Sequence, residues 1–196
     1  MIEDLPSEMT ASPAELYEPG PFKRTLFRYL AALALALLGG VFGIVGAFVQ
    51  EIRAGVSPLV VVLGAPIIEE ILKPSGLYVV VARWPRLFER QIYIAALAGL
   101  AGLVFGVLES TLYVKVYADD PSGAFIVYRF TVTVLLHTAA STIVGWGISE
   151  RLVRWASYGG GFPKTSRNAL IGGIALHALY NLTVTVLSWT GTLDFS

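Results

Sequence analysis

Five long apolar stretches constrain this chain more than any other feature of its sequence. A helix needs about 20 mostly apolar residues to cross the hydrocarbon core of a bilayer. Backbone polar groups must be satisfied inside lipid, which favours helices over irregular structure. The sequence therefore predicts an all-α, polytopic membrane helix bundle with about five transmembrane helices. The expected spans are Leu26–Gln50, Pro58–Ala82, Ile92–Val116, Ala124–Ser149 and Ala169–Trp189.

Composition supports a membrane protein and excludes several other classes. Only 14% of the residues are charged, against about 25% in a typical soluble domain. Lysine plus arginine equal aspartate plus glutamate at 14 each, so no basic excess indicates a nucleic-acid partner. The chain has no cysteine, which excludes a disulfide framework, a thiol nucleophile and cysteine-bound zinc.

Basic residues alternate between the connections of the expected spans. They occur before the first span, between the second and third, and between the fourth and fifth: Lys23, Arg24, Arg28, Arg83, Arg86, Arg90, Arg151, Arg154, Lys164 and Arg167. The positive-inside rule then predicts a cytoplasmic N-terminus and an external C-terminus. Residues 1–22 are acidic and proline-rich, which predicts a flexible tail before a single transmembrane domain over 23–196. We expect a multi-pass protein of the cell membrane, in contact with the lipid bilayer.

Polar side chains recur at one depth inside the expected spans. Counting about 1.5 Å per residue from the cytoplasmic end places most of them roughly 14 to 20 Å up, with Glu109 at roughly 27 Å. Such groups are costly in lipid, so they usually face the bundle interior and mark a functional site. Arg129, at roughly 32 Å, is expected to snorkel to the interface. The other members of this set are Glu69, Glu70, Lys73, His137, His177 and Asn181.

The second expected span carries the densest charge. Glu69 and Lys73 are four residues apart with the acid first, the favourable order for a helical ion pair. Glu69 and Glu70 differ by about 100° around a helix, so both cannot face the same water squarely. Pro66 and Pro74 bracket the pair. A proline kink could open a water-filled cavity beside the glutamates.

These residue types suit the hydrolysis of an amide bond. A base must activate water, and hydrogen-bond donors must stabilise the oxyanion and protonate the leaving amine. His177 and Asn181 are four apart and share a helix face. Serine chemistry is weakly supported, because Ser141 lies one turn from His137 without a nucleophile elbow. A paired-aspartate site is disfavoured, because no aspartate lies inside a span.

A metal site and two non-hydrolytic functions stay open at this point. His137, His177 and either Glu69 or Glu70 could hold zinc with an open position, although no H-E-x-x-H helix is present. Buried glutamate and histidine also relay protons, which allows a proton- or cation-coupled transporter or channel. A non-catalytic scaffold, including a pseudoenzyme that binds substrates without cutting them, is the third possibility.

Four short motifs resemble those of a known group of membrane proteases, the PrsW family. Glu69-Glu70-Ile-Leu-Lys73 resembles the family's E-E-x-x-K motif, and the others follow in the family's order. The second motif ends in Glu-Asn in the family and in Glu109-Ser110 here. The CAAX prenyl endopeptidase and bacteriocin-processing group is related, but its second charge more often follows one position later. The remaining matching motifs are Phe105-Gly-Val-Leu-Glu109, His137 and His177-Ala-Leu-Tyr-Asn181.

The resemblance implies an intramembrane endopeptidase that cleaves membrane-associated proteins or peptides, in a prokaryotic plasma membrane. It implies that Glu69 or Glu70 activates water while the other orients it, and that Lys73 supplies the counter-charge.

For the remaining residues, the resemblance implies supporting roles. His137 and His177 would position water or stabilise the oxyanion, Asn181 would complete the oxyanion site, and Glu109 would act as a supporting acid or orienting group.

Overall fold

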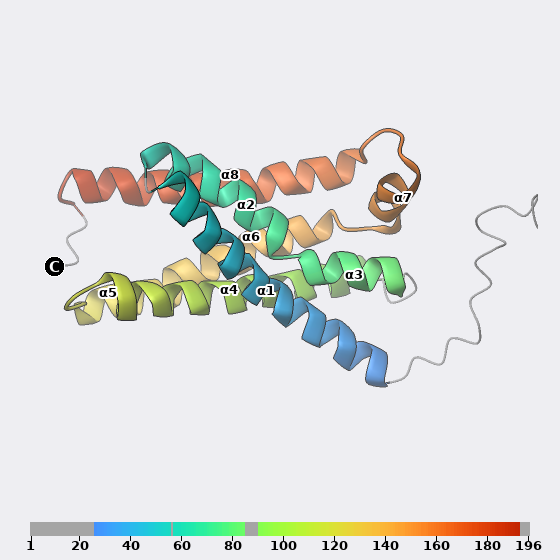
Figure 1. Cartoon of the computed structure of the whole chain (residues 1–196), viewed down its shortest axis with the longest axis horizontal. Helices are drawn as coiled ribbons and strands as arrows, with labels where there is room; N and C mark the ends of the chain where they lie inside the picture. The colour runs from blue at the N-terminus through green and yellow to red at the C-terminus, as the bar shows by residue number, and fades with distance from the viewer. Residues whose placement is uncertain (1–25, 56, 85–89, 193–196) are drawn as a thin grey trace, which may run out of the picture.

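The computed structural model describes residues 26–55, 57–84 and 90–192, and every regular element within them is helical. Figure 1 shows long helices running roughly side by side, with the N-terminal helix crossing them at an angle. The predicted tail over 1–22 lies outside the described residues. The all-α architecture predicted from the apolar stretches is confirmed.

Four continuous helical segments are long and apolar enough to cross a membrane. The first is α1 (Leu26–Ala54), and the last is α8 (Lys164–Trp189). Between them, α4 (Gln91–Leu112) runs into a π-helical turn, η4 (Tyr113–Tyr117). The third crossing joins α5, the π-helical turn η5 and α6 end to end, with bounds Gly123–Tyr128, Arg129–Thr133 and Val134–Trp146.

The expected span over Pro58–Ala82 is broken instead of forming one helix. A π-helical turn, η2 (Val60–Gly64), leads into α2 (Ala65–Leu72), and α3 (Ser75–Arg83) follows. The break falls at Pro74, which has no N–H to continue the ladder of α2. Figure 1 shows α2 and α3 lying at an angle to each other. The described part of the chain thus has four unbroken spans and one broken segment, and the predicted kink is confirmed.

The connection expected between the fourth and fifth spans also contains a helix. It is α7 (Glu150–Tyr158), followed by Gly159 and Gly160 at positive φ, and α8 then begins at Lys164. Figure 1 places α7 at one end of the bundle, beyond α6 and α8. The basic residues assigned to this connection therefore lie on α7 and in the first turns of α8.

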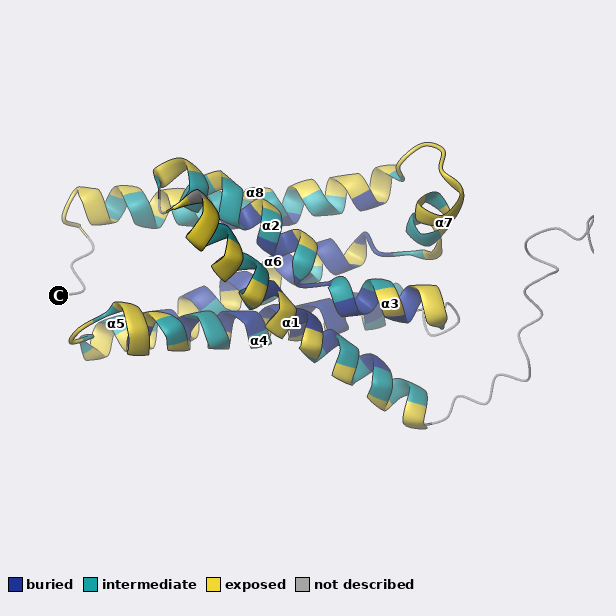
Figure 2. Cartoon of the chain, viewed as in Figure 1, coloured by how far each residue is buried: buried dark blue, intermediate teal, exposed yellow. Residues whose placement is uncertain are grey.

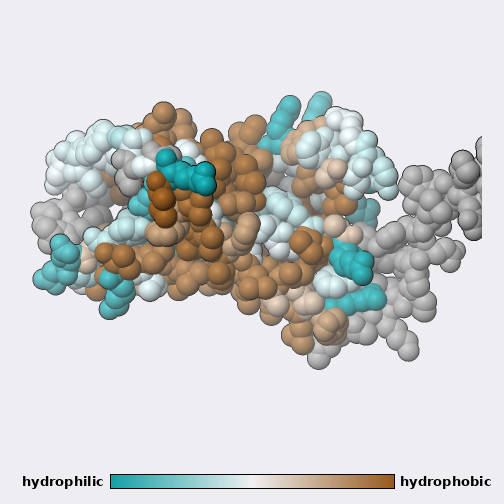
Figure 3. All heavy atoms as spheres, viewed as in Figure 1, coloured by the Kyte–Doolittle hydropathy of each residue, from teal (hydrophilic) through white to brown (hydrophobic). Residues whose placement is uncertain are grey.

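Charge separates the two ends of the molecule. At the end that carries α7 and the start of α1, the basic residues are Arg28, Arg83, Arg90, Arg151, Arg154, Lys164 and Arg167. Among the residues that the structure describes at this end, the acidic residue is Glu150. The opposite end holds Glu51, Arg53, Lys115, Asp119 and Asp120. Figure 3 shows hydrophobic residues covering the middle of the face in view. This distribution is that of a multi-pass membrane protein.

Close helix contacts build the bundle. The α4 helix packs along α6, α8 packs against α6 and α2, and α1 crosses α4 and the α2–α3 segment. A Cβ atom added at Gly102 would overlap the carbonyl oxygen of His137, so this glycine lets α4 approach α6.

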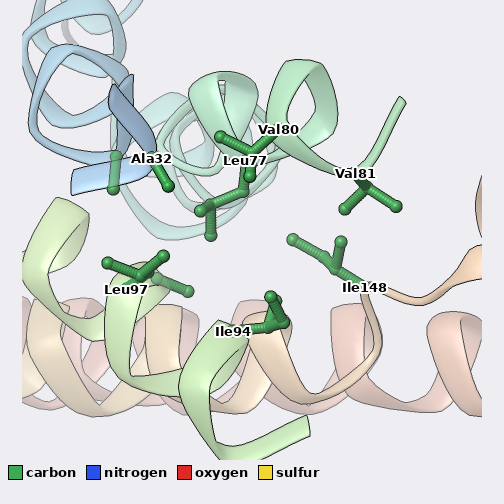
Figure 4. Close-up of a cluster of buried hydrophobic side chains, with 9 residues drawn as sticks. Ala32, Leu77, Val80, Val81, Ile94, Leu97 and Ile148 are labelled. Carbon is green, nitrogen blue, oxygen red and sulfur yellow. The ribbon is translucent and has the colours of Figure 1, made fainter. Parts of the chain in front are cut away.

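Buried residues concentrate where the helices meet (Figure 2). One apolar cluster joins α1, α3, α4 and the segment after α6, near the α7 end of the molecule (Figure 4). It packs α3, the second helix of the broken segment, against α1 and α4. Its labelled members are Ala32, Leu77, Val80, Val81, Ile94, Leu97 and Ile148.

Candidate active site

The α2 helix carries two adjacent carboxylates into the centre of the bundle. Glu70 is completely buried, and Glu69 is 4% exposed. Their partners differ, because adjacent helix positions point about 100° apart. Glu70 Oε1 and Oε2 both have hydrogen-bond partners, whereas Glu69 Oε2 accepts no hydrogen bond from the described residues.

Lys73, at the end of α2, is the central cation of the site and is completely buried. Its Nζ atom lies 2.7 Å from Glu70 Oε1 and 3.4 Å from Glu69 Oε2. The same atom lies 4.1 Å from the centre of the Phe105 ring. The predicted pair of Glu69 with Lys73 is present, but the shorter contact goes to Glu70. Lys73 therefore neutralises the buried carboxylates.

Space for Lys73 comes from a glycine of α1. A Cβ atom added at Gly43 would stand 3.1 Å from Lys73 Cγ and 3.0 Å from a ring carbon of Phe105. Because these contacts are tighter than ordinary van der Waals contacts, a larger residue at position 43 would press on the lysine stem and its aromatic neighbour. The small residues of α1 thus support the charged cluster as well as helix packing.

His177 and Ser141 complete the surroundings of Glu70. His177 Nδ1 lies 3.0 Å from Glu70 Oε1, and Ser141 Oγ donates to Glu70 Oε2 at 3.3 Å. A carboxylate only accepts hydrogen bonds, so Nδ1 carries a proton, and in the neutral imidazole Nε2 then keeps its lone pair. That lone pair lies 3.8 Å from Glu69 Oε2. Two acceptor atoms therefore face each other across a short gap.

His137 connects this cluster to Glu109. Its Nδ1 atom lies 2.9 Å from Lys73 Nζ, and its Nε2 atom lies 2.9 Å from Glu109 Oε2. An ammonium group only donates, so Nδ1 accepts and Nε2 donates to the carboxylate. The rings of His137 and His177 lie 4.7 Å apart at right angles. Both histidines singled out in the sequence therefore belong to one network.

Arg129 also belongs to this network, and the expectation that it snorkels to the interface is wrong. Its guanidinium donates to Glu109 Oε2 at 2.9 Å and lies 3.9 Å from the centre of the Tyr113 ring. The residue is 8% exposed. An ion pair with Glu109 compensates for its removal from water.

The π-helical turn η5 explains why the sequence placed Arg129 elsewhere. Eight residues separate it from His137, which in a regular α-helix puts the two about 80° apart. A π turn takes in one additional residue, which reduces the difference to about 20° on the same face. No residue pattern in η5, with sequence Arg-Phe-Thr-Val-Thr, distinguishes it from ordinary α-helix.

Asn181 reaches the site from α8, one turn beyond His177. Its Nδ2 atom donates to the carbonyl oxygen of Val61 at 2.8 Å. Val61 lies in η2, and Pro66, five residues later, has no N–H to donate to its carbonyl in the π-helical pattern. The asparagine thus fastens the start of the broken segment to α8. An amide carries a second N–H, which is not used in this bond.

Ser110 stands where the resembling family has asparagine. Its Oγ atom donates to the carbonyl oxygen of Arg129 at 2.7 Å. The hydroxyl is buried and secures η5 against α4. The position therefore retains a hydrogen-bonding role, directed at the backbone that carries Arg129.

A cavity of about 210 Å³ adjoins this network. Glu69, Glu109, His137 and Asn181 line it, whereas Glu70, Lys73 and His177 do not. The cavity continues between α1, η4 and the second half of α8, to Glu51, Tyr117 and Thr185 at the end opposite α7. The predicted cavity beside the glutamates is present. Of the adjacent pair Glu69 and Glu70, Glu69 is the one that lines it.

The donor set is compatible with a metal ion. One ligand atom each from Glu69, His137 and His177 lie within 4.8 Å of one another, and all three residues are buried. Glu69 Oε2, which accepts no hydrogen bond from the described residues, already lies 3.8 Å from His177 Nε2. Two histidines and a carboxylate match a catalytic zinc site. His137 would join them at the cost of its contact with Lys73.

The match to a known family covers almost the whole chain. The model described as PrsW family intramembrane metalloprotease matches residues 25–195. The chain belongs to the PrsW family. No curated protein and no solved structure matches the chain. The resemblance based on four short motifs is thereby confirmed.

Membership of the PrsW family makes this protein a membrane-embedded peptide hydrolase. That result favours the protease interpretation over the transporter interpretation of the buried Glu and His residues. The family description also names a metalloprotease, which agrees with the buried cluster of Glu69, His137 and His177.

Proposed function

We propose that this PrsW-family protein is an endopeptidase in which Glu69 is the general base for water. The observation that supports this assignment is the contrast between the two adjacent carboxylates. Glu69 lines the cavity, and its Oε2 atom accepts no hydrogen bond from the described residues and has only the longer ion pair with Lys73, while Glu70 is enclosed by Lys73, His177 and Ser141. A base must reach the water that it activates.

The gap between Glu69 Oε2 and His177 Nε2 is suited to a water molecule. Both atoms are acceptors 3.8 Å apart, so one water could donate a proton to each and direct its lone pair at a carbonyl carbon. Attack forms the new C–O bond as Glu69 takes a proton. Cleavage of the C–N bond then returns that proton to the leaving amine. Glu69 ends the cycle as a carboxylate.

Glu70 and Lys73 act as positioning residues in this scheme. Glu70 holds His177 through Nδ1, which keeps the lone pair of Nε2 toward Glu69. Lys73 holds Glu70 and His137 together and offsets the charge of both glutamates. Such fixed dipoles stabilise charge that develops in the transition state.

Other residues that line the cavity are candidates for the oxyanion site. Asn181 has a second amide N–H, and the Arg129–Glu109 pair fixes His137 at the edge of the cavity. Preorganised donors of this kind contribute on the order of 10²- to 10³-fold in rate. We assign Asn181 to the oxyanion and Glu109 to orienting His137.

A bound metal would be held by Glu69, His137 and His177. It would supply Lewis-acid polarisation and lower the pKa of water. The orientation of His177 by Glu70 serves either case, because ligating histidines depend on such partners.

Substrate reaches the site from the end of the bundle that carries Glu51 and Tyr117, because the cavity continues in that direction. With the basic end of the bundle on the cytoplasmic side, that opening faces the external side of a prokaryotic plasma membrane. The substrate is then a membrane-associated protein or peptide cut near the external leaflet.

Cleavage of a membrane-spanning peptide by the purified protein tests the proposal. Glu69→Gln should lower kcat by about 10²- to 10⁴-fold. The matched control is Glu51→Gln, because Glu51 lines the same cavity but lies outside the charged network. If folded Glu69→Gln protein cleaves as fast as the control, Glu69 is not the base. Absence of turnover by wild type with every membrane peptide tested would instead support a non-catalytic scaffold.

A further inference from the structure

A second cavity lies at the α7 end of the bundle, between α3, the end of α6, α7 and the start of α8. Its volume is about 510 Å³, within the range of about 300 to 1,000 Å³ typical of ligand pockets. It shares no lining residue with the catalytic cavity. The proposed protease mechanism makes no use of it. Its lining includes Tyr78, Val81, Leu152, Trp155, Phe162 and Leu170.

The lining is apolar and offers little for a polar ligand. The Ser166 hydroxyl is already used, because its Oγ atom donates to the carbonyl oxygen of Gly147 at 2.6 Å. Trp155 and Phe162 stack edge to face with centroids 4.6 Å apart, where α7 approaches the start of α8. An occupant must therefore be mainly hydrocarbon.

Basic residues lie on the two helices that border the same cavity, α7 and α8. Arg151 and Arg154 are exposed on α7 and adjoin the lining residues Leu152, Val153 and Trp155 in sequence. Lys164 and Arg167 are exposed in the first turns of α8, on either side of Ser166. Glu150 is the acidic residue among the described residues 146–170. An apolar cavity bordered by two helices that carry exposed basic residues has the chemistry for an amphiphile with an anionic head.

The position of the cavity in the bundle indicates which class of amphiphile could occupy it. The α7 end carries the arginine-rich connections, so it meets the headgroup region of one leaflet. Basic pockets between transmembrane helices at this level bind anionic lipid headgroups. The geometry points to a site for an anionic phospholipid, with an acyl chain in the cavity and the phosphate held by Arg151 and Arg154.

Such a lipid would brace the broken segment. Ile71 and Tyr78 both line the cavity, and they stand on either side of the break at Pro74. Glu70 immediately precedes Ile71 in α2. An acyl chain packed against both helices fills space beside the break and stabilises the angle at which α2 presents its carboxylates.

Fluorescence quenching by brominated lipids tests this site directly, because Trp155 lines the cavity. The test variant keeps Trp155 alone, through Trp84→Phe, Trp146→Phe and Trp189→Phe. In vesicles that mix brominated and plain lipids, phosphatidylglycerol should be preferred over phosphatidylcholine at Trp155. The matched control keeps Trp189, which is 71% exposed on the opposite end of α8, and should show no preference.

Two variants separate charge from the cavity itself. The double variant Arg151→Gln, Arg154→Gln should bind phosphatidylglycerol about 30-fold more weakly relative to phosphatidylcholine. If the wild-type preference is smaller than that, the preference should disappear. The control Arg53→Gln with Lys115→Gln removes two exposed cations from the other end and should leave the preference intact. Ala156→Trp should fill the cavity, because Ala156 lines it and is exposed.

Native mass spectrometry of the wild-type protein gives an independent readout if a tryptophan variant does not fold. Retained phosphatidylglycerol, displaced by the Ala156→Trp change, supports the site. Equal quenching by the two lipids at Trp155 would overturn it. If a membrane-spanning peptide displaces the quencher from Trp155 and added phosphatidylglycerol does not, the cavity binds a peptide instead of a lipid.

Discussion

Glu69 and Glu70 are neighbours in the chain but have different surroundings. Glu69 lines the catalytic cavity with one oxygen that accepts no hydrogen bond from the described residues, and Glu70 is enclosed by an ammonium, an imidazole and a hydroxyl. The helix separates the two side chains by about 100°, so one carboxylate can face substrate while the other holds the supporting residues. This division leads to distinct expectations for the two positions.

The two glutamine variants should differ in which property they lose. Glu69→Gln should reduce kcat strongly with little change in unfolding free energy, because Glu69 makes few hydrogen bonds. Glu70→Gln should destabilise the protein by about 3 kcal/mol, because it weakens a buried ion pair. Peptide cleavage and denaturant titration of both purified variants measure the difference. Equal loss of stability in both would contradict the assignment.

Lys73 should be the most stability-critical charge of the site. Lys73→Met leaves two buried carboxylates without their cation and should cost about 3–5 kcal/mol. Adding Glu70→Gln in the same chain should recover part of that loss, because one uncompensated charge disappears. Thermal unfolding in detergent compares the single and double variants. A double variant less stable than the single one would show that Lys73 does not act as the counter-charge.

Arg129 should act on the reaction through Glu109. Arg129→Met should lower kcat by about 10- to 100-fold with little effect on KM, because His137 loses its fixed orientation. Arg129→Lys keeps the charge and should retain part of the activity. The control is Arg53→Gln, an exposed arginine outside the network. Wild-type kinetics for Arg129→Met would leave this arginine with a purely structural role.

Metal binding should depend on Glu70 although Glu70 is not a proposed ligand. If the cluster holds metal, His177→Ala should abolish Co(II) binding, and Glu70→Gln should weaken it by about 10- to 100-fold. Absorption of Co(II) in the purified protein measures both variants without relying on activity. Glu150→Gln provides the control at the surface. Undiminished cleavage after chelation, with no Co(II) uptake, would support water activation by Glu69 without metal.

The contact of α4 with α6 should be intolerant of a single methyl group. Gly102→Ala places a Cβ atom against the carbonyl oxygen of His137 and the Ser141 side chain, so the helices must separate. We expect a loss of about 1–3 kcal/mol and reduced activity. Gly123→Ala meets no atom within 4 Å and should be near neutral. Thermal unfolding of the two variants gives the comparison, and equal midpoints would show that the helix contact is loose.

The sequence alone determined the class of the protein and the members of its charged cluster. The length of the apolar stretches predicts membrane-spanning helices. Because charged groups are costly in lipid, Glu69, Glu70, His137 and His177 are expected to face one another inside the bundle. The prolines indicated where the second segment would break. These inferences hold because they depend on local composition and on the price of exposing polar groups to lipid.

Only the tertiary structure decided how the cluster is arranged. It places Glu69 in the cavity and Glu70 behind it, a choice that depends on how α2 is rotated against α1, α6 and α8. It also brings Arg129 to Glu109, because the π-helical turn η5 changes the register by one residue. Neither result can be read from residue spacing, since rotation and register are set by packing between segments far apart in the chain.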